Sequence, residues 1–184
     1  MSSVTQLATL TMLHSSSVRL FGVLSGTAVL MSFVAPGRAQ IVPDTTLHGE
    51  SSNINLNQVV RDDLADLIEG GAIRGGNLFH SFQEFNIDAG QRVYFANPEG
   101  IDSILSRITG GDPSNIFGML GVDGTADLFL LNPNGIVFGE TAALDIEGSF
   151  FATTAEAIPL GNGVYSATAP EQSSLLTVNP SAMV

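Results

Sequence analysis

The feature that most constrains the fold of this chain is a strand-and-turn unit that occurs twice, 35 residues apart. Residues 93–96 are followed by Asn97-Pro98-Glu99-Gly100-Ile101, and residues 128–131 by Asn132-Pro133-Asn134-Gly135-Ile136. Proline fixes φ near about −65°, an asparagine side chain caps the turn, and glycine accepts a positive φ. Isoleucine then begins the next apolar strand. Residues 177–180 (TVNP) begin the unit a third time, 47 residues further on.

Short strand signals fill the chain, and each ends at Gly, Asn, Asp or Pro. No helical period of a dozen residues lies between the strands from Asn77 onward, so the sequence does not support βαβ units. The predicted strands are 53–57, 78–82, 84–88, 93–96, 101–108, 116–122, 128–131, 136–138, 144–146, 150–154 and 175–178. One short helix is predicted at 59–69, because Val60, Leu64 and Ile68 stand at helical spacing. Gly70 and Gly71 end it.

Repeated strand-and-turn units favour coils that stack on one another, because a single coil cannot bury its own apolar face. A right-handed parallel β-helix, an all-β fold, is therefore the leading prediction. A β-sandwich is the alternative, because short antiparallel strands with frequent turns give a similar pattern. The spacings of 35 and 47 residues exceed the roughly 20 to 30 residues of one coil, which implies intervening coils or excursions.

The first 39 residues have the layout of a secretory signal peptide. Residues 20–35 carry no charge, Arg19 precedes them, and Pro36 and small residues follow. Cleavage is predicted between Ala39 and Gln40, after export by the Sec machinery. A membrane anchor is the alternative, but sixteen residues fall short of the about 20 that a span needs.

The charge of the chain argues against nucleic acid and anionic membranes as partners. All six basic residues are arginines, and two of them precede Gln40, whereas all 18 acidic residues follow it. A chain that starts at Gln40 therefore has only four scattered cations, and binding to phosphate backbones needs clustered ones. There is no cysteine, which excludes a disulfide framework.

No group of residues in the sequence indicates catalysis, and we expect no catalytic residue, no metal and no cofactor. His80 lies in a predicted strand, where a buried histidine is the expected role. His48 has acidic neighbours, but three such residues in a loop are weak grounds for a metal site. The acidic residues of 62–69 read as a solvated helix face. A polysaccharide-acting or carbohydrate-binding β-helix protein is the alternative function, because such proteins share the predicted fold.

A series of motifs resembles the N-terminal secretion domain of filamentous-haemagglutinin-like two-partner secretion exoproteins. The motifs occur in order at 77–82 (NLFHSF), 85–86, 97–101 (NPEGI), 105–111 (LSRITGG), 130–139 (LLNPNGIVFG) and 149–154 (SFFATT). The resemblance covers about residues 40 to 160. The second unit matches the family's NPNGI motif residue for residue, and the first departs from it at Glu99.

The resemblance implies the fold, the route and the partner. The fold would be a β-helix with an N-terminal cap and extra-helical strands. The partner would be an outer-membrane β-barrel transporter whose periplasmic POTRA-type domains recognise a chain held unfolded, and the product would be secreted or displayed at the cell surface. We expect residues 40–184 to form this domain, truncated before a passenger such as an adhesin. The expected secretion-motif residues are Asn97, Pro98, Gly100, Ile101, Asn132, Pro133, Asn134, Gly135 and Ile136.

Overall fold

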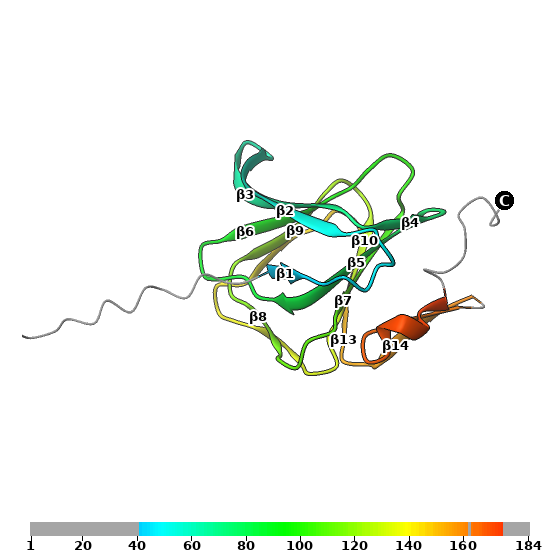
Figure 1. Cartoon of the computed structure of the whole chain (residues 1–184). Coiled ribbons are helices and arrows are strands. Elements are labelled where there is room, and N and C mark those ends of the chain that lie inside the picture. The colour runs from blue at the N-terminus through cyan, green and yellow to red at the C-terminus, as the bar shows by residue number, and fades with distance from the viewer. Residues whose placement is uncertain (1–40, 162, 175–184) are drawn as a thin grey trace, which may run out of the picture. The chain divides into compact units, whose positions relative to one another are not determined.

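The computed structural model describes residues 41–161 and 163–174, which form stacked coils of short strands (Figure 1). The strands are β1 (Ile41–Pro43), β2 (Ser52–Val60), β3 (Asp63–Gly70), β4 (Ala72–Arg74), β5 (Asn77–Phe85), β6 (Arg92–Ala96), β7 (Ser103–Ile108), β8 (Ser114–Ile116), β9 (Met119–Asp123), β10 (Asp127–Leu131), β11 (Ile136–Phe138), β12 (Ala143–Asp145), β13 (Phe150–Thr153), β14 (Ala157–Leu160) and β15 (Gly163–Ser166). A 3₁₀ turn, η1 (Pro170–Gln172), follows.

Each coil has three sides, and strands of successive coils pair in parallel. The first side is a sheet in the order β1-β5-β7-β10-β13, the second a sheet in the order β12-β9-β6-β3-β2, and the third the pair β8-β11. Leu78, Ile104, Leu128 and Phe150 are aligned in the first sheet, so the coil shortens from 26 to 24 to 22 residues. The parallel stacking confirms the predicted right-handed parallel β-helix and excludes the β-sandwich.

Antiparallel strands close the first coil, and two more form a hairpin outside the coils. β1 and β4 pair with β5, and β2 pairs with β3, so both large sheets begin with an antiparallel strand. β14 and β15 form a hairpin outside the coils. These elements are the N-terminal cap and the extra-helical strands that the family resemblance implied.

The first sheet is buried on both faces. Its inner face contributes Leu78, Ile104 and Leu128 to the core that fills the coils. Its outer face packs Phe79 and Leu105 against side chains from outside the coils, among them Tyr165 of β15. Burial on both faces explains why the sequence of this sheet reads as continuous apolar runs such as 128–131.

The helix predicted at 59–69 is wrong, because these residues form most of the hairpin β2–β3. The chain reverses at Arg61 and Asp62, whose φ values of 51° and 65° are typical of a tight hairpin turn. β3 then pairs with β6, so the helical spacing of its apolar residues was coincidental. The acidic side chains of 62–69 therefore lie on a hairpin.

Two predicted strands are joined, one is divided and one cannot be assessed. The strands predicted at 78–82 and 84–88 fall into the single strand β5, which ends at Phe85. The strand at 116–122 splits into β8 and β9 at Gly118, where the carbonyl oxygens of Asp88 and Gln91 approach the chain so closely that a Cβ would lie 2.3 Å from each. The strand at 175–178, the third unit at 177–180 and the cleavage site at Ala39 and Gln40 lie outside the described residues.

Candidate functional site

The second strand-and-turn unit makes the corner between β10 and β11. The Gly135 amide donates to the Asn132 carbonyl oxygen at 3.1 Å, which closes a four-residue turn with Pro133 and Asn134 at its centre. The Asn134 amide also donates to Asn132 Oδ1 at 2.9 Å, so the asparagine side chain caps the turn. The order Asn, Pro, Asn, Gly suits a type I turn, which favours proline second and glycine fourth.

Asn132 also ties this corner to the coil before it. Its Nδ2 donates to the Asp112 carbonyl oxygen at 3.1 Å and to Ser114 Oγ at 3.0 Å. The Asn132 side chain is fully buried, whereas Asn134 is exposed. Asn134 Nδ2 donates to the Gly110 carbonyl oxygen at 2.7 Å and to Asn132 Oδ1 at 3.4 Å. In the folded domain Asn134 is therefore accessible to a partner and Asn132 is not.

The first unit makes a different corner, between β6 and β7, and its turn is shifted by one residue. The Ile101 amide donates to the Pro98 carbonyl oxygen at 3.2 Å, which puts Glu99 and Gly100 at the centre. Gly100 has a φ of +82°, which glycine adopts without steric cost. Glu99, the residue that departs from the family motif, is exposed.

Asn97 ties its corner to the coil that follows. Its Oδ1 accepts hydrogen bonds from the amides of Thr125 and Ala126, both at 3.0 Å, and its Nδ2 donates to the Ile101 carbonyl oxygen at 2.9 Å. The two units thus occupy different corners, one full coil plus one side apart. This arrangement accounts for a 35-residue spacing that is not a coil length.

Sequence reasoning missed a buried arginine that uses all its hydrogen-bond donors. Arg107 of β7 is fully buried. Its Nε donates to Ser81 Oγ at 2.8 Å, its Nη1 to the Ser166 carbonyl oxygen at 2.7 Å and to Ser173 Oγ at 2.6 Å, and its Nη2 to Thr46 Oγ1 at 2.8 Å and the Thr46 carbonyl oxygen at 3.2 Å. These five bonds use all five N–H groups of a guanidinium. The sequence feature that could have revealed Arg107 is an arginine between apolar residues in the predicted strand 101–108.

Hydroxyl groups connect this arginine to a half-buried acid. Asp44 accepts hydrogen bonds from the hydroxyls of Thr46 at 2.7 Å, Ser81 at 2.8 Å and Thr109 at 2.6 Å. Burial alone would raise the pKa of Asp44, but these hydrogen bonds outweigh it and hold the pKa below its usual value. Asp44 therefore stays ionised, and Arg107 compensates its charge through shared hydroxyls.

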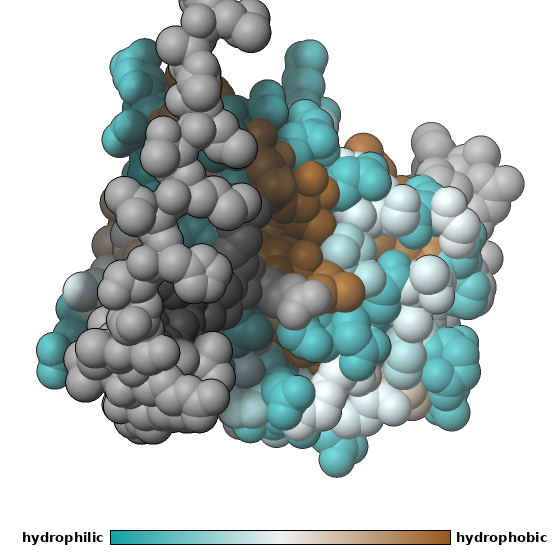
Figure 2. All heavy atoms as spheres, turned by 60° about the vertical axis from the view of Figure 1, so that its left-hand side comes forward, coloured by the Kyte–Doolittle hydropathy of each residue, from teal (hydrophilic) through white to brown (hydrophobic). Residues whose placement is uncertain are grey.

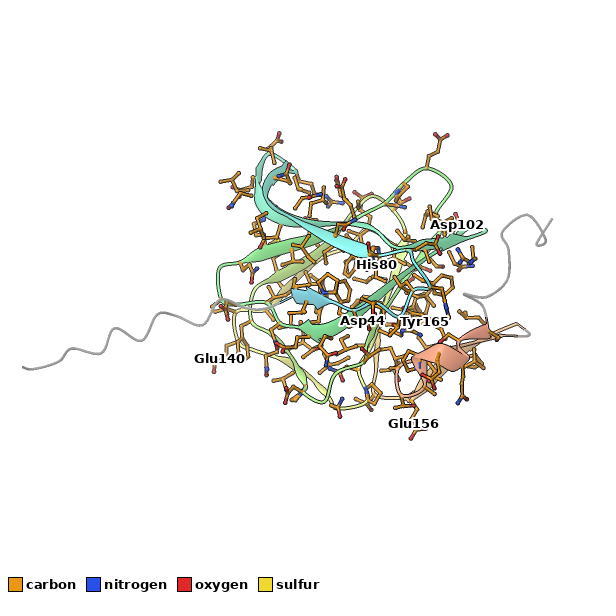
Figure 3. All side chains as sticks on the ribbon, viewed as in Figure 1. Asp44, His80, Asp102, Glu140, Glu156 and Tyr165 are labelled. Atoms are coloured by element: carbon orange, nitrogen blue, oxygen red, sulfur yellow. The ribbon has the colours of Figure 1, made fainter. Side chains whose placement is uncertain are left out.

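Tyr165 brings the extra-helical hairpin onto this cluster. Its ring lies 4.5 Å from the Arg107 guanidinium carbon and packs edge-on against Phe79. Its hydroxyl donates to the His80 carbonyl oxygen. Burial raises the pKa of Tyr165 above its usual value, so the phenol stays neutral. Figure 3 shows Asp44, His80 and Tyr165 close together beside β5.

His80 is buried, as predicted, but only half of its imidazole is paired. Nδ1 lies 3.0 Å from Ser52 Oγ, and Nε2 has no hydrogen-bond partner among the described residues. Burial lowers the pKa of His80 from 6.5 to about 3, so the ring is neutral near pH 7. Its inward position between Phe82 and Phe95 gives it no access to a substrate.

A groove of about 570 Å³ lies between the hairpin β2–β3 and the segment before β6. Leu56 and Leu64 line it together with Asp66 and Arg92. The Gln91 side chain donates to Asp66 at 2.8 Å, and Arg92 donates to the Tyr94 hydroxyl at 2.9 Å, so both charged groups serve the structure. Figure 2 shows hydrophobic side chains gathered in one area of an otherwise largely polar face.

Metal sites and membrane-spanning helices are both absent from the described part of the chain. Within residues 41–161 and 163–174, no three acidic, histidine or cysteine side chains are grouped so that they could hold a metal ion. The same residues contain no helix long and apolar enough to cross a membrane.

The family model of the TPS secretion domain matches residues 39–183. The chain belongs to the TPS secretion domain family. It is thus a secretion domain of the two-partner secretion type. The match begins at Ala39 and includes both asparagine corners.

Two individual proteins are also similar to this TPS secretion domain. The heme/hemopexin-binding protein of Haemophilus influenzae is 34% identical over 73 residues, which are 40% of this chain and 8% of that protein. The crystal structure of the filamentous hemagglutinin secretion domain superposes with a TM-score of 0.52 at 23% identity, over 67% of this chain and 45% of that one. The second likeness shows the fold. The chain spans a small part of the first relative's length.

Proposed function

We propose that residues 40–184 carry an exoprotein to its outer-membrane β-barrel transporter, which engages them through periplasmic POTRA-type domains. The Sec machinery delivers the chain to the periplasm, and residues 1–39 are removed between Ala39 and Gln40. The observation that carries the proposal is the family match, which begins at Ala39, where the signal-peptide pattern independently predicts cleavage. The product is secreted or held at the cell surface, at the head of an adhesin-type exoprotein.

The two corners have separate roles in this proposal. Asn132 acts through folding, because its buried amide joins the turn to the preceding coil. Asn97 likewise acts by joining two coils. Asn134 and Glu99 are exposed in the folded domain, so burial does not assign them a role in folding. We assign to them, and to their neighbours in the turns, the contact with the transporter before the chain folds.

The experiment is co-expression of the full chain with its transporter in a Gram-negative host. We expect release into the medium with the transporter, retention in the periplasm without it, and a mature N-terminus at Gln40 by sequencing. Asn132→Ile and Asn134→Ile should reduce release while cleavage at Gln40 continues. Glu140→Ile is the matched control, because Glu140 is exposed in the turn between β11 and β12. Release that is independent of the transporter would overturn the proposal, and an intact N-terminus would overturn the export step.

A further inference from the structure

Arg107 is bonded to segments from the beginning and the end of the described chain. Thr46, 61 residues before it, follows β1 in the N-terminal cap. Ser166 and Ser173, 59 and 66 residues after it, belong to the extra-helical hairpin and the segment behind η1. Nη2 bonds only to the cap residue and Nη1 only to the hairpin segment, so the two segments share one guanidinium.

A shared buried cation makes the two segments dependent on each other. When the hairpin covers Arg107, water is removed from the guanidinium, and any N–H without an acceptor then costs free energy. If the cap loop is open, Nη2 lacks both acceptors, and covering Arg107 becomes unfavourable. If the hairpin is undocked, water can hydrate Arg107, and closing the cap then gains less free energy. Such coupling is reciprocal by thermodynamic linkage.

We infer that Arg107 couples closure of the N-terminal cap to docking of the C-terminal hairpin, so that the hairpin docks stably only on a chain whose cap has formed. The coupling is a property of the folded chain and does not depend on the transporter. In a chain that emerges from its N-terminus, the last segment to arrive would then complete the domain only if the first had folded correctly.

The test is hydrogen exchange on the full chain, read at the amides of β14 and β15. Thr46→Val keeps the shape of the side chain and removes the hydroxyl that accepts from Nη2. We expect about tenfold faster exchange in the hairpin, the size of a typical coupling between sites. Thr141→Val is the matched control, because it makes the same substitution and removes a hydroxyl that donates a hydrogen bond away from the hairpin, to the Phe117 carbonyl oxygen. It should leave hairpin exchange unchanged.

The decisive measurement repeats Thr46→Val in a chain that also carries Arg107→Met. Without the guanidinium, Thr46→Val should no longer accelerate exchange in the hairpin. Acceleration that persists in the Arg107→Met chain would overturn the inference, since the effect would then pass through the lost hydrogen bond to Asp44 or through packing at the neighbouring Leu47. If Arg107→Met does not fold, the comparison of Thr46→Val with Thr141→Val decides: equal hairpin exchange in the two would overturn the inference.

Discussion

The different burial of the two asparagines in the second corner gives a quantitative test of what the corner does. Asn132→Ala removes two hydrogen bonds donated to the preceding coil, one accepted from the Asn134 amide, and a long one of 3.4 Å accepted from Asn134 Nδ2. At about 1 kcal/mol for each of the three shorter bonds, the free energy of unfolding should fall by about 3 kcal/mol. Asn134→Ala removes one short bond to the Gly110 carbonyl oxygen and the long bond of 3.4 Å to Asn132 Oδ1, both from an exposed side chain, so its cost should stay near about 1 kcal/mol.

Urea unfolding of the chain from Gln40, followed by far-UV circular dichroism, measures both variants under the same conditions. For a domain of this size, about 3 kcal/mol corresponds to a fall in melting temperature of roughly 6 to 12 °C. Equal destabilisation by the two substitutions would refute the reasoning, because burial and bond number would then not determine the loss. A release defect in Asn134→Ala with unchanged stability would assign that side chain to contact with the transporter.

Three further outcomes follow from single features of the fold. The pKa of His80 falls from 6.5 in the unfolded chain to about 3 in the folded one, so the free energy of unfolding is unaffected by His80 above about pH 6.5. It should decrease as the pH falls from 6.5 toward 3, by up to about 1.4 kcal/mol per pH unit. Equal urea midpoints at pH 7 and pH 5 would contradict this. Gly110→Ala should destabilise by about 1 to 3 kcal/mol, because its Cβ would lie 2.0 Å from the Gln83 carbonyl oxygen, whereas Gly111→Ala meets no atom within 4 Å and should be nearly neutral; similar melting temperatures for the two variants would count against so close an approach of the two coils at Gly110. Arg61→Met breaks two partly exposed ion pairs and the hydrogen bond from Nη2 to the Val122 carbonyl oxygen, so it should cost about 1 to 2 kcal/mol in thermal unfolding; no measurable loss would contradict the hydrogen bond to Val122.

The strands of the coils could be predicted from the sequence because each is an apolar run ended by a turn residue. β6, β10 and β11 were located almost residue for residue. The hairpin β2–β3 could not be separated from a helix, because Val60, Leu64 and Ile68 fit a helical period and no local residue records that β3 pairs with β6. Pairing between distant strands decides such a segment, and short periodic patterns do not contain that information.

The candidate site also has a part that the sequence predicts and a part that it does not. The turn chemistry of Asn132, Pro133 and Gly135 is local, so the sequence was sufficient to anticipate a capped turn there. That the two units occupy different corners depends on coil length, which the 35-residue spacing alone does not determine. The Arg107 cluster draws its partners from segments about 60 residues away on either side, so only the folded chain brings them together.

The two asparagine corners also differ in when their partners become available to a chain that leaves a pore with its N-terminus first. Asn132 bonds to the Asp112 carbonyl oxygen, 20 residues earlier in the chain, so its acceptor is already outside when it emerges. Asn97 accepts from the amide of Thr125, 28 residues later, and must wait for a further coil to arrive. A chain halted after Asn97 but before Thr125 has left the pore would lack this hydrogen bond at its first corner. Each coil that emerges would therefore stabilise the coil before it.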